Sequence, residues 1–187
     1  MTATISLANH LLIAMPGMQD PNFSTTVTLI CEHSDAGALG IVINRPSGMT
    51  LGGLFEQLDL EDADPAAARR PVLVGGPVGP ERGFVLHEAA YSYEHSLSVS
   101  GDIRLTLSRD VLDAMATGRG PGRSLVALGY AGWEAGQLDR EMLANSWLTV
   151  EATPRLVFDL PFDQRWAAAA GTLGVDISRM SGDAGHA

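Results

Sequence analysis

The chain has 187 residues and a formal net charge of −10. Because nucleic-acid affinity comes mainly from cations that meet phosphates, this balance disfavours a protein whose main task is to bind DNA or RNA. All twelve basic residues are arginine, which excludes a Schiff-base lysine or a lysine phosphate clamp.

Cys31 is the only cysteine, so the chain can form neither an internal disulfide nor a multi-cysteine zinc site. No stretch approaches the roughly 20 apolar residues that cross a bilayer, and the N-terminus lacks a basic leader followed by an apolar run. We therefore expect a cytoplasmic protein without membrane contact. Its length predicts a single domain over 1–187, with a loose tail at 181–187.

Runs of apolar and β-branched residues predict three strands near the N-terminus, at 11–15, 25–31 and 39–43. The segment 16–22 holds two prolines and an asparagine, so we expect a loop there. Asn44-Arg45-Pro46 ends the third run because proline cannot donate to a strand ladder.

A short amphipathic helix is expected over 51–58, with Thr50 as its cap. The acidic, alanine-rich residues 59–70 that follow are expected to form a solvated loop. The run 72–74 predicts a strand. Two prolines in 75–80 then favour a backbone turn over a phosphate-holding helix start.

A further strand is expected to open at 83–86. The period-two alternation over 97–107, interrupted at Gly101-Asp102, predicts two short strands joined by a turn or a bulge. Ser108 is placed to cap a helix over 109–117.

The stretch Ser124–Glu151 holds the densest set of structural signals. Its apolar run 125–128 predicts a buried strand. The glycines that follow alternate with Tyr130 and Trp133, which predicts that the strand ends in a tight aromatic turn.

A short helix over 138–143 and a strand over 147–150 are expected after this turn. Glycines between a strand and a helix can hold an anion, but here no lysine or arginine lies among them and Glu134 adds a negative charge. We therefore expect the glycines to allow close packing around the two aromatic side chains. Farther on, 156–158 predicts a last short strand and 163–173 a helix with its tryptophan on the buried side.

Histidine and cysteine raise the question of metal binding or catalysis. Three glutamates each have a histidine neighbour: Glu32-His33, His87-Glu88 and Glu94-His95. Adjacent strand residues point to opposite faces, so these are not chelating pairs, and we predict no metal site. Cys31 and His33 would share a face, as a thiolate and its base require, but the apolar run around Cys31 favours an unreactive thiol. No hydrolase signature surrounds the serines, and we predict no catalytic residue.

The arginines allow either structural or binding roles. Arg45 can bind an anion, or it can tie loop carbonyls and a carboxylate together, and we favour the second role. Arg104, Arg109, Arg119 and Arg123 form the densest arginine group. Aspartates between them indicate a mixed solvated face rather than a nucleic-acid groove reader.

Several of these motifs occur in one order along nearly the whole chain. They are Met15-Pro16-Gly17-Met18, Cys31-Glu32-His33, Gly40–Pro46, Gly75-Gly76-Pro77-Val78, Arg82–His87, Gly129–Leu138, Asn145-Ser146-Trp147-Leu148, Arg165-Trp166 and Gly185-His186-Ala187. With these motifs the sequence resembles the bacterial AlgH/YqgE family, although its alanine-rich stretch 61–70 departs in detail.

The resemblance implies an α+β fold: a bifurcated, mostly antiparallel β-sheet that includes a small closed barrel and is surrounded by helices. It implies a regulator of gene expression, from a proposed role in alginate production. It brings no enzyme activity, cofactor or binding residue that can be carried over to this chain.

We therefore expect a regulatory protein that acts through a protein or small-molecule partner, without cofactor and without direct DNA readout. The alternatives are a DNA-binding regulator, which rests on the family label alone, and an enzyme or small-molecule-binding domain. In the last case the pocket would lie among strand-end loops that also carry Met15–Gly17, Cys31 and His33. The candidate ligand-binding residues are Arg45, His87, Tyr130 and Trp133.

Overall fold

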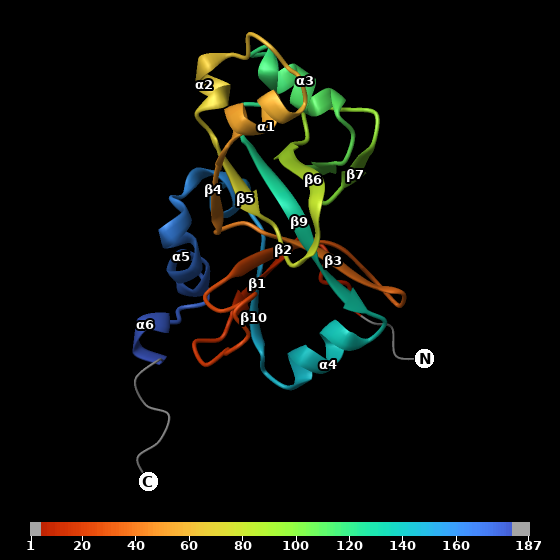
Figure 1. Cartoon of the computed structure of the whole chain (residues 1–187). Helices are drawn as coiled ribbons and strands as arrows, with labels where there is room; N and C mark the ends of the chain where they lie inside the picture. Colours follow the sequence, from red (N-terminus) through yellow and green to blue (C-terminus); the bar gives the residue numbers. More distant parts are fainter. Residues whose placement is uncertain (1–4, 181–187) are drawn as a thin grey trace.

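The computed structural model describes residues 5–180, which are organised around one long strand, β9 (Ser124–Glu134). This strand crosses the molecule diagonally, from helices α1, α2 and α3 at one end to α4 at the other (Figure 1). The tail predicted at 181–187 lies outside the described residues.

The described residues form a 10-stranded sheet in the order β10-β1-β2-β3-β9-β6-β8-β7, with β4 and β5 beside this path. The other strands are β1 (His10–Ala14), β2 (Val27–Ser34), β3 (Gly37–Val42), β4 (Pro46–Thr50), β5 (Pro71–Val74), β6 (Val78–Glu88), β7 (Ser96–Ser98), β8 (Ile103–Thr106) and β10 (Trp147–Glu151). β5 and β9 run parallel, and the other described pairs are antiparallel. The mostly antiparallel sheet is confirmed, whereas the small closed barrel is not: the sheet curls into an open half-barrel.

β9 joins the two halves of the sheet because it changes partners along its length. Its first part pairs with β5 and β6, and its last part pairs with β3. Gly129, with φ of 80°, lies where the partners change. The predicted aromatic turn is therefore wrong, since the chain continues through the glycines as a strand.

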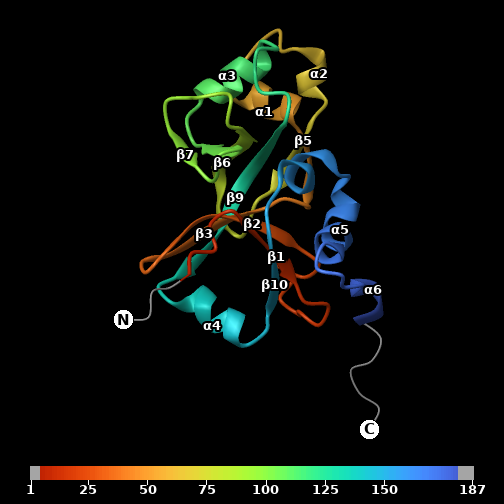
Figure 2. The same ribbon diagram turned by 180° about the vertical axis from the view of Figure 1, so that it is seen from behind.

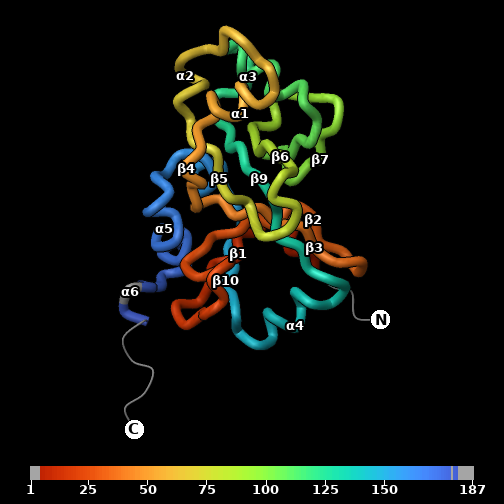
Figure 3. The backbone as a smooth tube through the Cα atoms, viewed as in Figure 1, coloured from red at the N-terminus to blue at the C-terminus, as the bar shows by residue number. Residues whose placement is uncertain are grey.

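The turn from β5 to β6 crosses β9 at very short range, and its path can be followed in Figure 3. Gly75 donates its N–H to the Leu128 carbonyl (2.9 Å) and accepts from the Val42 N–H (2.8 Å). A Cβ on Gly76 would lie 2.1 Å from the carbonyl carbon of Tyr130. Only glycine permits this approach of two backbones. On the β9 side, a Cβ on Gly129 would lie 2.5 Å from the Gly76 carbonyl oxygen, so this glycine allows close packing against a backbone rather than around the two aromatic side chains.

Short helices cover the ends and one side of the sheet. They are α1 (Leu51–Gln57), α2 (Pro65–Ala68), α3 (Asp110–Ala116), α4 (Gln137–Leu143), α5 (Arg165–Gly171) and α6 (Ile177–Met180), with a π-helical turn η1 (Arg155–Asp159) and a 3₁₀ turn η2 (Phe162–Gln164). Figure 2 shows α5 and α6 along the same side as β5 and β10. Thr50 caps α1 as predicted, because its hydroxyl accepts from the Gly53 N–H at 3.3 Å.

Residues 46–50, for which the sequence pattern predicts no element, pair with β5 as β4. Three local predictions are wrong. Residues 59–70, expected to form a solvated loop, contain α2, whose cap Asp64 donates its backbone N–H to Ala116 of α3. Residues 156–158 lie in η1, where packing against the core replaces strand pairing. Ser108 does not cap α3: its hydroxyl bonds the Asp110 carboxylate, and Arg109 holds the cap position.

The buried apolar residues form three clusters, which pack against different parts of the sheet. The largest packs the inner strands against η1 and α5. The second fills the space between α1, α3 and the first part of β9, and the third lies beneath α4. The third cluster includes Trp133 and borders the site described below.

Candidate functional site

A hollow of about 500 Å³ opens beside the turn between β2 and β3. Four residues that the sequence singles out line it: Cys31, Glu32, His33 and Trp133. The register of β2 against β3 shifts between Ile30 and Glu32, which leaves Cys31 as the extra residue of a bulge.

His33 connects three elements at the wall of this hollow. Its Nδ1 accepts from the backbone N–H of Leu7 at 2.9 Å, so in the neutral ring the proton resides on Nε2. Nε2 lies 3.5 Å from Oδ1 of Asp139 on α4. The histidine side chain is only 2% exposed, and it holds the N-terminal segment and α4 against β2.

Cys31 is present as a buried thiol. It is 2% exposed, and its Sγ donates to the Leu29 carbonyl at 3.7 Å. Burial, and secondarily the negative charge of Glu32, raise the pKa of the Cys31 thiol far above its usual range. A thiolate is therefore not available at neutral pH, which agrees with the unreactive thiol predicted from the apolar run.

Trp133 belongs to an aromatic group held by one carboxylate. Its indole Nε1 donates to Oε1 of Glu141 at 3.3 Å, and Trp147 donates to the same oxygen at 3.1 Å. Gln137 donates to Oε2 at 3.0 Å. Phe23 packs edge-on against Trp147, with ring centroids 5.5 Å apart.

The sequence reasoning missed Glu141. The available signal was its place four residues after Gln137 on a predicted helix, beside two tryptophans whose N–H groups need acceptors when buried.

The structure does not bring Arg45 and Tyr130 to this hollow. Arg45 donates to the carbonyls of Asn22 (2.6 Å) and Ser24 (2.7 Å), so it holds the loop after β1. The favoured role as a tie between loop carbonyls is thus observed, although no carboxylate pairs with Arg45 among the described residues. Tyr130 packs edge-on against Phe84, with centroids 5.6 Å apart.

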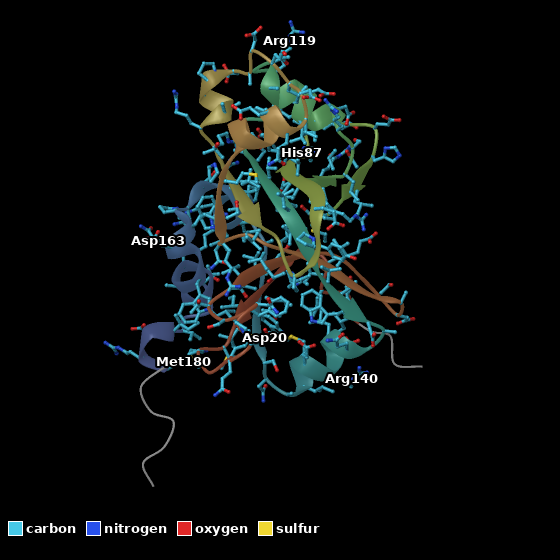
Figure 4. The ribbon with its side chains drawn as sticks, viewed as in Figure 1. Asp20, His87, Arg119, Arg140, Asp163 and Met180 are labelled. Atoms are coloured by element: carbon cyan, nitrogen blue, oxygen red, sulfur yellow. The ribbon has the colours of Figure 1, made fainter. Side chains whose placement is uncertain are left out.

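His87 lies in the other half of the molecule, close to α1 and α3 and far from Asp20 of the loop that Arg45 holds (Figure 4). It is fully buried, with Nδ1 2.8 Å from the Glu88 carbonyl. Because a carbonyl can only accept, Nδ1 carries the proton, and Nε2 accepts from the Thr106 hydroxyl at 2.6 Å. Burial is the main cause that lowers the pKa of His87.

Metal-binding clusters and membrane-spanning helices are both absent from residues 5–180. No three His, Cys, Asp or Glu side chains gather there in an arrangement that would hold a metal ion. None of the helices in this range is both long and apolar enough to cross a membrane.

The open half-barrel with its helical cover makes this an α+β protein, and comparison with known proteins identifies the family. The family model described as AlgH-like matches residues 11–178. A UPF0301 protein of Saccharophagus degradans is 55% identical over 183 residues, which cover 98% of this chain and 90% of the relative. A second UPF0301 protein, from Thioalkalivibrio sulfidiphilus, is 55% identical over 187 residues and covers 100% of both chains.

Two solved structures agree with this assignment. The solution structure of the AlgH protein from Pseudomonas aeruginosa aligns with a TM-score of 0.80 at 49% identity, and covers 100% of this chain and 99% of that one. The crystal structure of a Corynebacterium diphtheriae protein aligns with a TM-score of 0.74 at 17% identity over 98% of this chain and 95% of that one, which shows a shared fold. The chain belongs to the AlgH-like family.

Proposed function

We propose that this protein is a cytoplasmic regulatory protein that acts by binding a partner, a small molecule or a segment of another protein, at the hollow beside Cys31, His33 and Trp133. One observation carries the proposal. The hollow is of ligand size, but its thiol is buried and its histidine already has partners on both ring nitrogens. These features favour binding over nucleophilic catalysis.

The experiment is thermal unfolding of the purified protein against nucleotides, common metabolites, divalent metals and duplex DNA. A ligand at about a hundred times its dissociation constant stabilises the native state by roughly 2.7 kcal/mol, which raises the midpoint by several degrees. A small molecule that raises the midpoint supports binding, and a panel without effect favours a protein partner.

Two variants of the turn between β2 and β3 test whether a hit binds in this hollow. Ala36 is exposed and lines the hollow, whereas its exposed neighbour Asp35 does not. Ala36→Trp is expected to fill the space and abolish the stabilisation, and Asp35→Trp to retain it. If both variants respond as the wild type does, the ligand binds elsewhere.

Direct DNA binding is the second candidate, and the charges argue against it. Arg109 pairs with Asp113 at 3.4 Å, and Arg123 pairs with Asp159, so two of the four clustered arginines already have carboxylate partners. The net charge of −10 opposes approach to DNA. A salt-sensitive gel shift of a promoter fragment at nanomolar protein would overturn the proposal in favour of this candidate.

A further inference from the structure

A second, smaller hollow contains two arginines, Arg70 and Arg165, and the described residues place no carboxylate within ion-pair distance of either. We propose that this hollow binds a small oxyanion through these two guanidinium groups: the carboxylate of a short organic acid, or a phosphate.

Four segments that are distant in the sequence build the hollow. Leu51 begins α1, Arg70 directly precedes β5, Ser124 begins β9, and Phe162 and Arg165 come from η2 and α5. Figure 2 shows the η1–α5 segment beside β5, where these elements meet. The site therefore exists only in the folded protein.

Arg165 is a buried cation whose hydrogen-bonding capacity is only partly used. Its side chain donates to the carbonyls of Leu160 (3.0 Å), Ile43 (2.7 Å) and Phe158 (3.4 Å), and it lies 4.5 Å from the centroid of the Phe162 ring. A guanidinium has five N–H donors, so two remain. The residue is 2% exposed, and burial lowers the pKa of Arg165 to about 10.

Arg70 has more unused N–H donors than Arg165. It donates one bond, from Nη2 to the Ser124 carbonyl at 2.5 Å, and no other bond of its side chain is found within residues 5–180. Burial lowers the pKa of Arg70 as well. Two partly desolvated guanidinium groups thus share a hollow that supplies carbonyl oxygens but no full negative charge.

Two other arginines have the carboxylate partner that Arg70 and Arg165 lack: Arg109 and Arg123 each pair with an aspartate. The charge of Asp159 raises the pKa of Arg165, but the carboxylate of Asp159 is already bonded by Arg123. A desolvated charge is costly without a counter-charge. A carboxylate or phosphate provides that charge, with oxygens that suit the forked donors of arginine.

The size of the hollow limits the ligand. Its volume of about 190 Å³ is below the range of roughly 300–1,000 Å³ typical of drug-sized ligands, so a nucleotide does not fit. Phe158, Leu160 and Leu125 line the hollow beside the arginines and can contact a short apolar tail. Because the whole protein carries a charge of −10, anion binding must depend on these local cations rather than on long-range attraction.

The test is a titration followed through the arginine Nε–H signals of protein that carries ¹⁵N-labelled arginine. Sodium phosphate, acetate and butyrate are compared with sodium chloride at equal ionic strength. We expect saturable shifts of the Arg70 and Arg165 signals with phosphate or with the carboxylates, and no saturable shift with chloride. The comparison of anions identifies the ligand class. Saturable shifts with phosphate but not with the carboxylates indicate a phosphate site. Tighter binding of butyrate than of acetate indicates an organic acid with an apolar tail.

Matched variants make the result decisive. Arg70→Gln loses one hydrogen bond to a carbonyl and is expected to fold and to lose the saturable Arg165 shift, whereas Arg70→Lys retains part of it. Arg45→Gln removes an arginine that also donates to carbonyls but lies outside the hollow, and should respond as the wild type does. The proposal is overturned if no anion gives a saturable shift, or if Arg70→Gln responds like the wild type.

Discussion

The indole nitrogen of Trp147 lies 3.1 Å from Oε1 of Glu141, to which it donates a hydrogen bond. The same carboxylate also accepts from Trp133 and Gln137, so it satisfies two nearly buried indole groups at once. It links α4 to β9 and β10.

We predict that Glu141→Ala lowers the free energy of unfolding by about 2 kcal/mol, because it leaves two indole N–H groups without their acceptor. Urea denaturation measures this loss. Glu134→Ala, at the exposed end of β9, is the control and should change the free energy by less than about 0.5 kcal/mol. An equal effect of the two variants would show that the carboxylate contributes nothing specific.

A pH dependence is predicted for His87. Burial lowers its pKa below the usual value of 6.5, so the unfolded chain binds more protons than the folded one as the pH falls through that value. Stability is therefore lost from about pH 6.5 downward, by up to about 1.4 kcal/mol per pH unit, until the lower folded pKa is passed.

The measurement is urea denaturation at several pH values for the wild type and for His87→Gln. The variant should show a smaller loss of stability below pH 6.5. His95→Gln, which alters an exposed histidine, should follow the wild type. If all three proteins show the same dependence on pH, His87 titrates normally in the folded state.

Cys31 is predicted to resist thiol reagents in the native state, since only the thiolate reacts and burial raises the pKa of this thiol far above its usual range. Labelling with Ellman's reagent at pH 8 should be at least about a hundredfold slower in the folded protein than in denaturant, where an ordinary thiol pKa near 8.5 applies. Rapid, complete labelling without denaturant would contradict the buried thiol.

Gly76→Ala is predicted to destabilise the protein by about 3 kcal/mol or more, because the added Cβ would lie 2.1 Å from the Tyr130 carbonyl carbon and neither backbone can move away cheaply. Gly83→Ala, in β6 beyond the turn that holds Gly76, is the control, since nothing lies within 4 Å of a Cβ there. Thermal unfolding compares the two. A loss of similar size at Gly83 would point to strand flexibility rather than to the crossing over β9.

Much of the local structure can be predicted from residue patterns. The Thr50 cap with the apolar spacing behind it predicts α1, and the alternation over 97–107 predicts the hairpin of β7 and β8. For the site, the apolar run around Cys31 indicates an unreactive thiol, and the proline after Arg45 indicates a structural arginine. These inferences succeed because each depends on neighbours within a few residues, which set the periodicity and the available turn conformations.

The remaining features depend on residues that meet only in the folded chain. Gly129 permits a turn or a continued strand, and the crossing of Gly76 over Tyr130 selects the strand. Arg165 donates a hydrogen bond to the carbonyl of Ile43, 122 positions away in the sequence. It also lines one hollow together with Arg70, although no local sequence pattern relates these three residues. Contacts of this range arise from packing of the whole sheet, because burial of apolar surface, and not short-range propensity, decides which distant segments come together.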